Sequence, residues 1–367
     1  MTMKRREFLK LSAVSVGGVM TLTTMPNLAF AQSVQRLKYD SYVTEHASPS
    51  VLDRWFLDEL VKRTDGAVEI EYYWAQSLNK AGAHLNAIKN NISEISLISP
   101  GYYQSDLPVT RGLEWYYKMD RADALLRVCR DVYDNYEPLR QEWESRHKAK
   151  VLYWTNWYYC PLITREPINS MEDLKGKRIR GYGVGTDVVE SLGGRAIPMA
   201  APEVYSSLER GVLDGAFGFD FITAISYALH EPAPYITEIG SGPHAPSATV
   251  IGIDAWNALP DDVKSVANEL ADEIYQGKYR EIYAGIAEDR VRKALDEGAQ
   301  FSKWDDSEIE RAANLVQPEQ VNSWIENVAS QAGIDGSEMQ SIVDEAIKRH
   351  DSSGSLKTPF EIYQDMS

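Results

Sequence analysis

Short strands and helices alternate in the first part of the chain, and this alternation constrains the fold more than any other feature of the sequence. Alternating or continuous apolar residues predict strands at residues 37–42, 68–73 and 95–99. Between these strands, apolar residues recur near helical spacing in residues 49–64 and 81–90, which predicts two helices. The resulting β-α-β-α-β order favours an α/β fold with a parallel, doubly wound sheet.

A second segment repeats this arrangement. Residues 205–214 resemble residues 85–94, because each combines a helix end, a turn and an acidic residue that leads into a strand. We therefore expect two lobes, each built from a sheet and its helices. No spacer rich in Gly, Ser or Pro separates them, so extended segments near residues 153–157 and 244–251 are predicted to cross between the lobes.

Residues 260–298 predict the longest helix. Pro260 followed by two aspartates is a favourable helix start, and apolar residues then recur at intervals close to 3.6. Gly277 and Gly285 weaken the middle, where a bend is expected. At about 1.5 Å per residue, this helix is long enough to lie across both lobes. The tail at residues 306–350 predicts two further helices.

These elements suggest the domain boundaries. A chain of 367 residues is long enough for more than one hydrophobic core. We expect residues 32–155 to form the first lobe, completed by about residues 245–285. We expect residues 156–244 to form the second lobe, completed by about residues 286–367.

The composition argues against several classes of protein. A formal net charge of −16 is unfavourable for nucleic-acid binding, which needs a basic surface. Cys129 and Cys160 are too few for a disulfide scaffold or a four-thiolate zinc site, and their spacing does not show whether they pair. The six histidines have no metal-ligand spacing, so no metal site is expected. No other cofactor is expected either.

The first 31 residues have the character of an export signal. Basic residues at positions 4, 5, 6 and 10 precede a weakly apolar run, and Ala-Phe-Ala at residues 29–31 fits a signal-peptidase site. The paired arginines resemble a twin-arginine signal, with Sec export as the alternative. The apolar run is too short to span a membrane. We therefore expect cleavage after about Ala31 and a product in an oxidising compartment, most simply the periplasm.

No catalytic motif is evident. Residues 181–185 contain three glycines between a strand and a helix, but Thr186 stands where a dinucleotide-binding fingerprint needs its third glycine. The chain also has no nucleophile elbow, zinc-protease helix or phosphate-loop motif. An enzyme is therefore not expected.

Arg180 is the clearest candidate for a ligand-binding residue. A short turn ending in Gly176 leads the chain into a strand that ends with Arg180. Doubly wound sheets bind their ligands at the carboxyl ends of strands. A planar guanidinium there can hold a carboxylate through two parallel hydrogen bonds. Taken alone, however, an arginine at a strand end more often has a structural or surface role.

Residues 173–180 resemble a phrase of a known family. These are the solute receptors of tripartite ATP-independent periplasmic (TRAP) transporters, the dicarboxylate-binding-protein family. The family's phrase is Asp-Leu-Lys-Gly-x-Lys-Ile-Arg, and here Arg178 replaces its second lysine. Further matches follow in residues 193–215, and the resemblance extends over about residues 36 to 300.

The resemblance implies a two-lobed periplasmic-binding-protein fold with crossing strands and a long helix spanning both lobes. It also implies that Arg180 clamps the carboxylate of a small organic acid. The lobes would close around this solute, and the receptor would deliver it to the membrane subunits of a TRAP transporter.

The residues that follow depart from the family's pattern. Many relatives have a polar residue just after the position of Gly215, where this chain continues with Ala-Phe-Gly-Phe-Asp. A plain dicarboxylate is therefore less expected, and the many aromatic residues favour a flat or apolar body attached to a carboxylate. Arg180 is predicted to bind the carboxylate, and the cavity is predicted to be shaped by Trp157, Tyr159, Tyr182, Phe219 and Tyr102, with polar contacts from Tyr42, Glu45 and Asp220.

Two alternatives stay open. The same fold could bind a cationic or zwitterionic amine, held by aromatic ring faces with Asp220 or Glu45 as the counter-charge. The other alternative is an exported enzyme on the same scaffold, although the sequence offers no pair of a base and a nucleophile.

Overall fold

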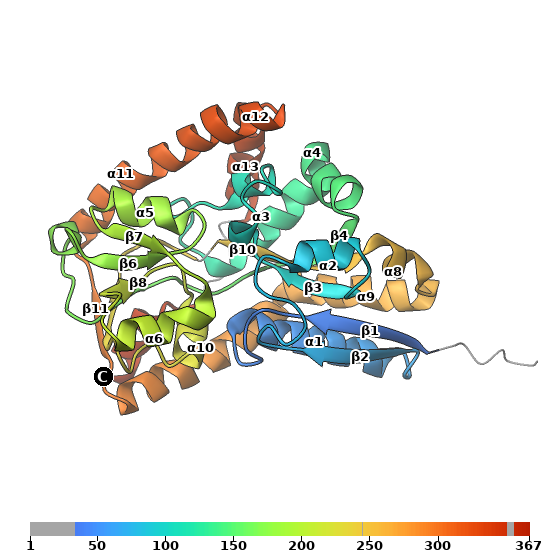
Figure 1. Ribbon diagram of the computed structural model, residues 1–367, viewed down its shortest axis with the longest axis horizontal. Helices are drawn as coiled ribbons and strands as arrows, with labels where there is room; N and C mark the ends of the chain where they lie inside the picture. Colours follow the sequence, from blue (N-terminus) through green and yellow to red (C-terminus); the bar gives the residue numbers. More distant parts are fainter. Residues whose placement is uncertain (1–33, 244, 351–355) are drawn as a thin grey trace, which may run out of the picture. The chain divides into compact units, whose positions relative to one another are not determined.

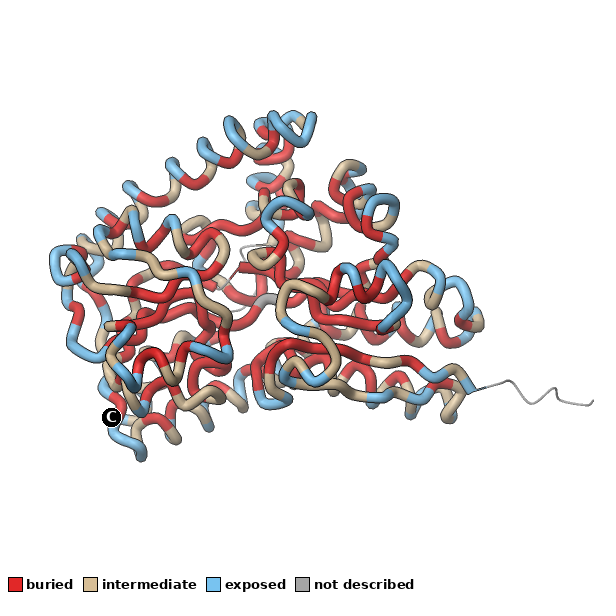
Figure 2. The backbone as a smooth tube through the Cα atoms, viewed as in Figure 1, coloured by how far each residue is buried: buried red, intermediate tan, exposed pale blue. Residues whose placement is uncertain are grey.

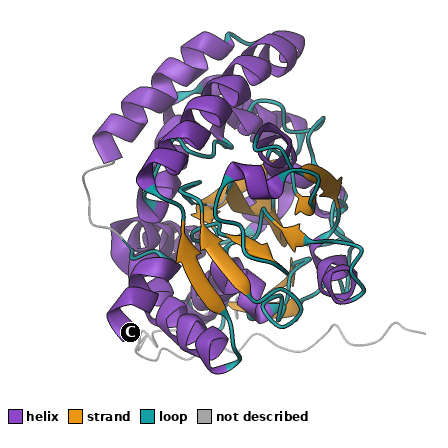
Figure 3. Ribbon diagram, turned by 90° about the vertical axis from the view of Figure 1, so that its left-hand side faces the viewer, coloured by secondary structure: helices purple, strands orange, loops and turns teal. Residues whose placement is uncertain are grey.

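The computed structural model describes residues 34–243, 245–350 and 356–367 (Figure 1). The predicted export signal at residues 1–31 lies outside the described residues. Two β-sheets with helices around them make up the described fold (Figure 3). The prediction of an α/β fold with two lobes is therefore confirmed. We call the part built on the five-stranded sheet lobe I and the part built on the six-stranded sheet lobe II.

Lobe I is built on a mixed sheet. Its strands are β1 (Gln35–Asp40), β2 (Val68–Tyr73), β3 (Ile95–Ile98), β4 (Ala149–Asn156) and β10 (Pro246–Gly252), in the order β2-β1-β3-β10-β4. β1 runs parallel to β2 and β3, as predicted, whereas β10 is antiparallel to β3 and β4. The predicted parallel arrangement therefore holds for the first three strands, whereas the whole sheet is mixed because β10 enters from lobe II in the opposite direction.

Lobe II is built on a second mixed sheet. Its strands are β5 (Leu162–Thr164), β6 (Arg178–Gly181), β7 (Arg195–Pro198), β8 (Gly215–Ala216), β9 (Tyr235–Glu238) and β11 (Gln300–Lys303), in the order β11-β9-β5-β8-β6-β7. β6 is parallel to β7 and β8, while β5 is antiparallel to β8 and β9. The three parallel strands place the carboxyl end of β6 in the middle of this group.

Two extended segments connect the sheets. One follows β4 and continues into β5, and the other leaves β9 and continues into β10. They meet where Tyr159 and Pro243 form an isolated antiparallel bridge. The crossings predicted near residues 153–157 and 244–251 therefore coincide with the end of β4 and the start of β10.

Helices surround both sheets, and buried residues follow the strands and the inner sides of these helices (Figure 2). No helix in the described ranges is long and apolar enough to cross a membrane. The α-helices are α1 (Ser48–Arg63), α2 (His84–Lys89), α3 (Ala122–Asn135), α4 (Glu137–Gln141), α5 (Gly185–Ser191), α6 (Val204–Glu209), α7 (Phe221–Ser226), α8 (Ile253–Ala258), α9 (Asp261–Glu273), α10 (Tyr279–Asp296), α11 (Asp306–Trp324), α12 (Ser330–Ala332), α13 (Gly336–His350) and α14 (Pro359–Met366). Short 3₁₀ or π segments are η1 (Pro100–Tyr102), η2 (Thr110–Leu113), η3 (Glu142–Arg146), η4 (Met171–Leu174), η5 (Ala201–Glu203), η6 (Ile274–Lys278) and η7 (Ile325–Ala329).

The long helix predicted at residues 260–298 forms as α9 and α10, which η6 joins. Gly277 in η6 has a φ of 146°, which other residues rarely adopt, so the bend predicted there is confirmed. α9 packs against α1 of lobe I, and α10 packs against α7 of lobe II. The helix therefore contacts both lobes. The tail forms the two predicted helices as α11 and α13, and adds α14, which was not predicted.

The two cysteines do not form a disulfide. Cys129 in α3 and Cys160 in the first crossing segment are both buried, free thiols. Burial raises the pKa of Cys160 to about 12 and also raises the pKa of Cys129.

A buried carboxylate connects the strands of lobe I to helix α1. Asp53 of α1 is fully buried. Its Oδ1 accepts hydrogen bonds from Tyr153 Oη of β4 at 2.5 Å and from Thr249 Oγ1 of β10 at 2.7 Å, and its Oδ2 accepts one from Tyr39 of β1. Burial raises the pKa of Asp53 to about 6, although the three hydroxyl donors partly oppose this shift.

We predict that Asp53 makes the free energy of unfolding fall as the pH rises from about 4 to about 6. In this range the native carboxyl keeps its proton, whereas the unfolded chain, with an aspartate pKa of about 3.9, has lost it. The contribution is therefore present below this range and is lost above it, with a change of at most about 3 kcal/mol. Urea unfolding of the wild type and Asp53→Asn across this range measures it. A stability difference between the two proteins that stays constant with pH would contradict the prediction.

Candidate functional site

Arg180 lies at the carboxyl end of β6, where its side chain is held by backbone carbonyls. The residue is only 1 % exposed. Its Nε donates to the Met199 carbonyl at 3.0 Å, and its Nη1 donates to the carbonyls of Phe217 at 3.2 Å and Gly218 at 2.6 Å. These partners follow β7 and β8, the strands that flank β6 in the sheet. The parallel strands therefore fix the orientation of the guanidinium.

No carboxylate among the described residues forms an ion pair with Arg180. Its guanidinium Cζ lies 4.3 Å from the ring centre of Phe219 and 5.2 Å from that of Tyr182. Burial lowers the pKa of Arg180, because the charged form loses its hydration. A buried charge is costly unless an opposite charge accompanies it. The side chain is thus prepared to receive an anion.

The cavity beside Arg180 lies between the lobes. The free space in it is about 10 Å³, which is room for about one water molecule. Lobe I contributes residues of the β1–α1 loop and of η1, while lobe II contributes β6 and the loops after it. The lining residues are Tyr42, Val43, Tyr102, Trp157, Arg180, Tyr182, Ala201, Gly218, Phe219 and Thr223. Half of these residues are aromatic, and the set contains neither a carboxylate nor a histidine.

A chain of hydrogen bonds orients two of the aromatic walls. Tyr182 Oη donates to Ser99 Oγ at 2.6 Å, and Ser247 Oγ donates to the same Ser99 oxygen at 3.0 Å. Trp157 Nε1 donates to Ser247 Oγ at 2.6 Å. Ser99 and Ser247 belong to lobe I and Tyr182 to lobe II, so the chain joins both lobes.

Six of the nine residues proposed from the sequence line this cavity. They are Arg180, Trp157, Tyr182, Phe219, Tyr102 and Tyr42. Val43, Ala201, Gly218 and Thr223 line it as well and were not predicted. A Cβ on Gly218 would lie 3.3 Å from Arg180 Nη1 and 3.1 Å from Tyr182 Cβ, so a glycine lets this carbonyl approach the guanidinium. The sequence feature that could have indicated Gly218 is its position between Phe217 and Phe219.

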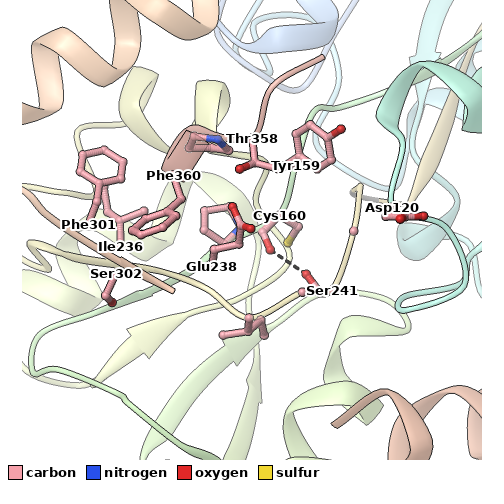
Figure 4. Close-up of a pocket in the computed structure, with 15 residues that line it drawn as sticks. Asp120, Tyr159, Cys160, Ile236, Glu238, Ser241, Phe301, Ser302, Thr358 and Phe360 are labelled. Atoms are coloured by element: carbon pink, nitrogen blue, oxygen red, sulfur yellow. Dashed lines mark hydrogen bonds between the residues drawn. The ribbon is translucent and has the colours of Figure 1, made fainter. Parts of the chain in front are cut away.

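Tyr159 lies in a different cavity (Figure 4). Its hydroxyl donates to the Leu356 carbonyl at 2.9 Å, so it holds the segment that leads into α14. The lining of this second cavity, of about 80 Å³, includes Cys160, Glu238 and Phe360. The structure thus separates Tyr159 from Arg180.

Glu45 and Asp220 also lie outside the cavity around Arg180. Glu45 Oε2 accepts a hydrogen bond from Arg54 Nη2 at 3.0 Å, and about half of its side chain is exposed. Asp220 is the N-cap of α7, where its Oδ1 accepts from the Thr223 backbone amide at 3.1 Å. Burial raises the pKa of Asp220 to about 6. In the described ranges, no three His, Cys, Asp or Glu side chains are placed to hold a metal ion.

The sequence of this chain matches a known protein family. Residues 41–327 match the sequence profile of the bacterial extracellular solute-binding proteins, family 7. The match covers well over half of the chain. This chain belongs to that family.

Relatives of this family 7 chain are distant in sequence but close in fold. The uncharacterized protein YiiZ of Salmonella typhimurium is 26% identical over 243 residues, or 64% of this chain and 69% of YiiZ. A TRAP solute-binding protein from a marine metagenome, specific for aromatic acid ligands and solved with 3-hydroxybenzoate, has a TM-score of 0.77 at 21% identity, with 86% of this chain and 99% of that chain covered. Another from Pseudomonas putida, solved with D-glucuronate, has a TM-score of 0.68 at 19% identity, with 84% and 96% covered. The predicted two-lobed fold is thereby confirmed.

We predict that Asp220 stabilises α7 and does not contact the solute. Asp220→Ala should lower the free energy of unfolding by about 1 kcal/mol, because the N-cap acceptor is lost. Asp220→Ser should keep most of the stability, because its hydroxyl can accept the same hydrogen bond. Urea titrations of the three proteins measure these differences. Unchanged stability in Asp220→Ala, together with loss of solute binding in both variants, would instead make Asp220 a ligand contact.

Proposed function

We propose that this chain is the extracytoplasmic receptor of a TRAP transporter and that it binds a small organic acid through Arg180. The observation that carries the proposal is a buried guanidinium without a carboxylate partner among the described residues, facing a cavity between two lobes. A carboxylate bound there would supply the missing opposite charge through charge-assisted hydrogen bonds. Membership of family 7 supports the receptor role.

The cavity wall favours an acid with a flat, apolar body. Aromatic side chains from both lobes face the space, and several of their polar atoms already have partners. Tyr182 donates to Ser99, and Trp157 donates to Ser247. Few groups therefore remain to bind the hydroxyls of a sugar acid. Each hydroxyl of the acid that is buried without a partner would lose its hydration, which is unfavourable. The aromatic acid bound by the marine metagenome relative supports this choice, whereas the relative with D-glucuronate represents the competing class.

Solute entry requires the lobes to move apart. The cavity has room for about one water molecule as the side chains lie, so side chains of the wall must shift and the lobes must part before a ring with a carboxylate can enter. The two crossing segments and the bend at Gly277 are the places where a hinge motion between the lobes can be accommodated.

The two alternatives are less well supported. An amine would lie beside the positive charge of Arg180, while Glu45 and Asp220 lie outside the cavity. The lining residues include no histidine or carboxylate that could serve as a base, so we propose binding without catalysis. We further propose that the signal at residues 1–31 directs the chain to the periplasm, where the receptor delivers its solute to the TRAP membrane subunits.

We predict that Arg180→Met weakens the binding of 3-hydroxybenzoate about ten- to a hundred-fold or more, because a charge-assisted contact contributes roughly 1.5–3 kcal/mol. Arg178→Met is the matched control. Arg178 lies on the same strand, but it pairs with Asp214 at 2.7 Å and its side chain is 39% exposed. Its loss should leave the affinity nearly unchanged.

Calorimetric titration of the wild type and both variants tests the proposal. A preliminary thermal-shift screen with aromatic acids, sugar acids, dicarboxylates and amines identifies the acid to titrate. A solute at a hundred times its dissociation constant adds about 2.7 kcal/mol to the stability of the folded state. Equal affinity of wild type and Arg180→Met for an acid, or stabilisation by amines alone, would contradict the carboxylate clamp.

A further inference from the structure

Tyr182 makes a short polar contact between the lobes beside the cavity. Its hydroxyl donates to Ser99 Oγ at 2.6 Å, and both residues are buried. Tyr182 follows β6 of lobe II, while Ser99 lies between β3 and η1 of lobe I. The ring of Tyr182 also lies 4.7 Å from the ring of Tyr102, centre to centre, which comes from η1.

Gly101 makes this contact sterically possible. A Cβ on Gly101 would lie 2.5 Å from Tyr182 Cζ and 2.8 Å from its hydroxyl oxygen, which is closer than real Cβ atoms approach. A Cβ on Gly183 would lie 2.9 Å from Gly101 Cα. The tyrosine ring can therefore lie against the backbone of η1 only because both lobes have a glycine at this place.

A second hydrogen bond also joins the two lobes. Thr223, which lines the cavity, accepts a hydrogen bond at its Oγ1 from the backbone amide of Ser48 at 3.1 Å. Ser48 is the first residue of α1 in lobe I, and Thr223 belongs to α7 in lobe II. None of these contacts uses Arg180, the residue proposed to bind the solute.

We propose that Ser99, Gly101 and Tyr182 form a latch that keeps the lobes closed and so sets how fast a bound solute leaves. This inference rests on the proposed function as a solute receptor. Tyr182 is suited to this role because its ring lies 5.2 Å from the Arg180 guanidinium while its hydroxyl reaches lobe I. Arg180 selects the carboxylate, whereas Ser99 and Gly101 lie outside the cavity lining and act as positioning residues that hold Tyr182 in place.

The test compares dissociation rates, measured by stopped-flow tryptophan fluorescence with 3-hydroxybenzoate and with mandelate. Ser99→Ala should raise the rate about three- to tenfold, as expected for the loss of a buried neutral hydrogen bond. Gly101→Ala should raise it further, because the added methyl group keeps the tyrosine ring from its place. The factor should be the same for both acids, since neither Ser99 nor Gly101 lines the cavity.

Two control variants separate the effect of the latch from a general loss of stability. Ser93→Ala removes a buried hydroxyl that pairs with Ser96 at 3.0 Å inside lobe I. Gly285→Ala adds a methyl group with no atom within 4 Å. Both should leave the dissociation rates unchanged. If Ser99→Ala fails to fold, Tyr182→Phe removes the same hydrogen bond from the other side.

Rates of Gly101→Ala within twofold of the wild type would overturn the latch. A rate change that differs between the two acids would also overturn it, because the residue would then contact the solute. Small-angle scattering of the wild type and Gly101→Ala, with and without acid, completes the test. The latch predicts a larger radius of gyration for Gly101→Ala than for the wild type. Equal radii of the two proteins, both with and without acid, would reject the latch. This comparison does not require that an acid binds, so it also holds if the proposed receptor function fails.

Discussion

The proposed binding site depends on one buried guanidinium, that of Arg180, whose charge the described part of the protein orients without neutralising it. Three backbone carbonyls hold the Arg180 guanidinium, and carbonyls supply dipoles but no net negative charge. A carboxylate side chain in place of these carbonyls would neutralise the guanidinium, and little charge would remain to attract an anionic ligand. Because aromatic rings keep water away, the remaining charge acts through a medium of low dielectric constant, where its attraction for an anion is strongest.

The two lobes contribute different parts of recognition. The carbonyls that hold Arg180 all come from segments after β7 and β8, so the charge and its orientation belong to lobe II alone. Lobe I contributes Tyr42 and Tyr102, which shape the space but add no formal charge. Within lobe I, Asp53 joins helix α1 to three strands of the sheet, because its side chain accepts a hydrogen bond from a residue of each strand.

The features that local patterns determine could be predicted from the sequence. Strand and helix positions follow from apolar periodicity, and the bend at Gly277 follows from a residue type with unusual backbone freedom. The direction of β10 could not be predicted, because strand polarity depends on distant partners and leaves no mark in the strand itself. Likewise, Trp157 and Tyr159 are two residues apart, and only the backbone path of the crossing segment sends them to different cavities.

Both thiols are buried, so they are expected to react slowly with thiol reagents in the native protein at neutral pH. The thiolate is the reactive form, and burial both disfavours it and blocks access to it. Cys129 of α3 lies in a hydrophobic cluster with residues of lobe I, whereas Cys160 lies in a hydrophobic cluster with residues of lobe II. Each sulfur is therefore modified only when its own surroundings open. The rate at which each cysteine is modified therefore reports how often its own lobe opens locally, and no engineered label is needed.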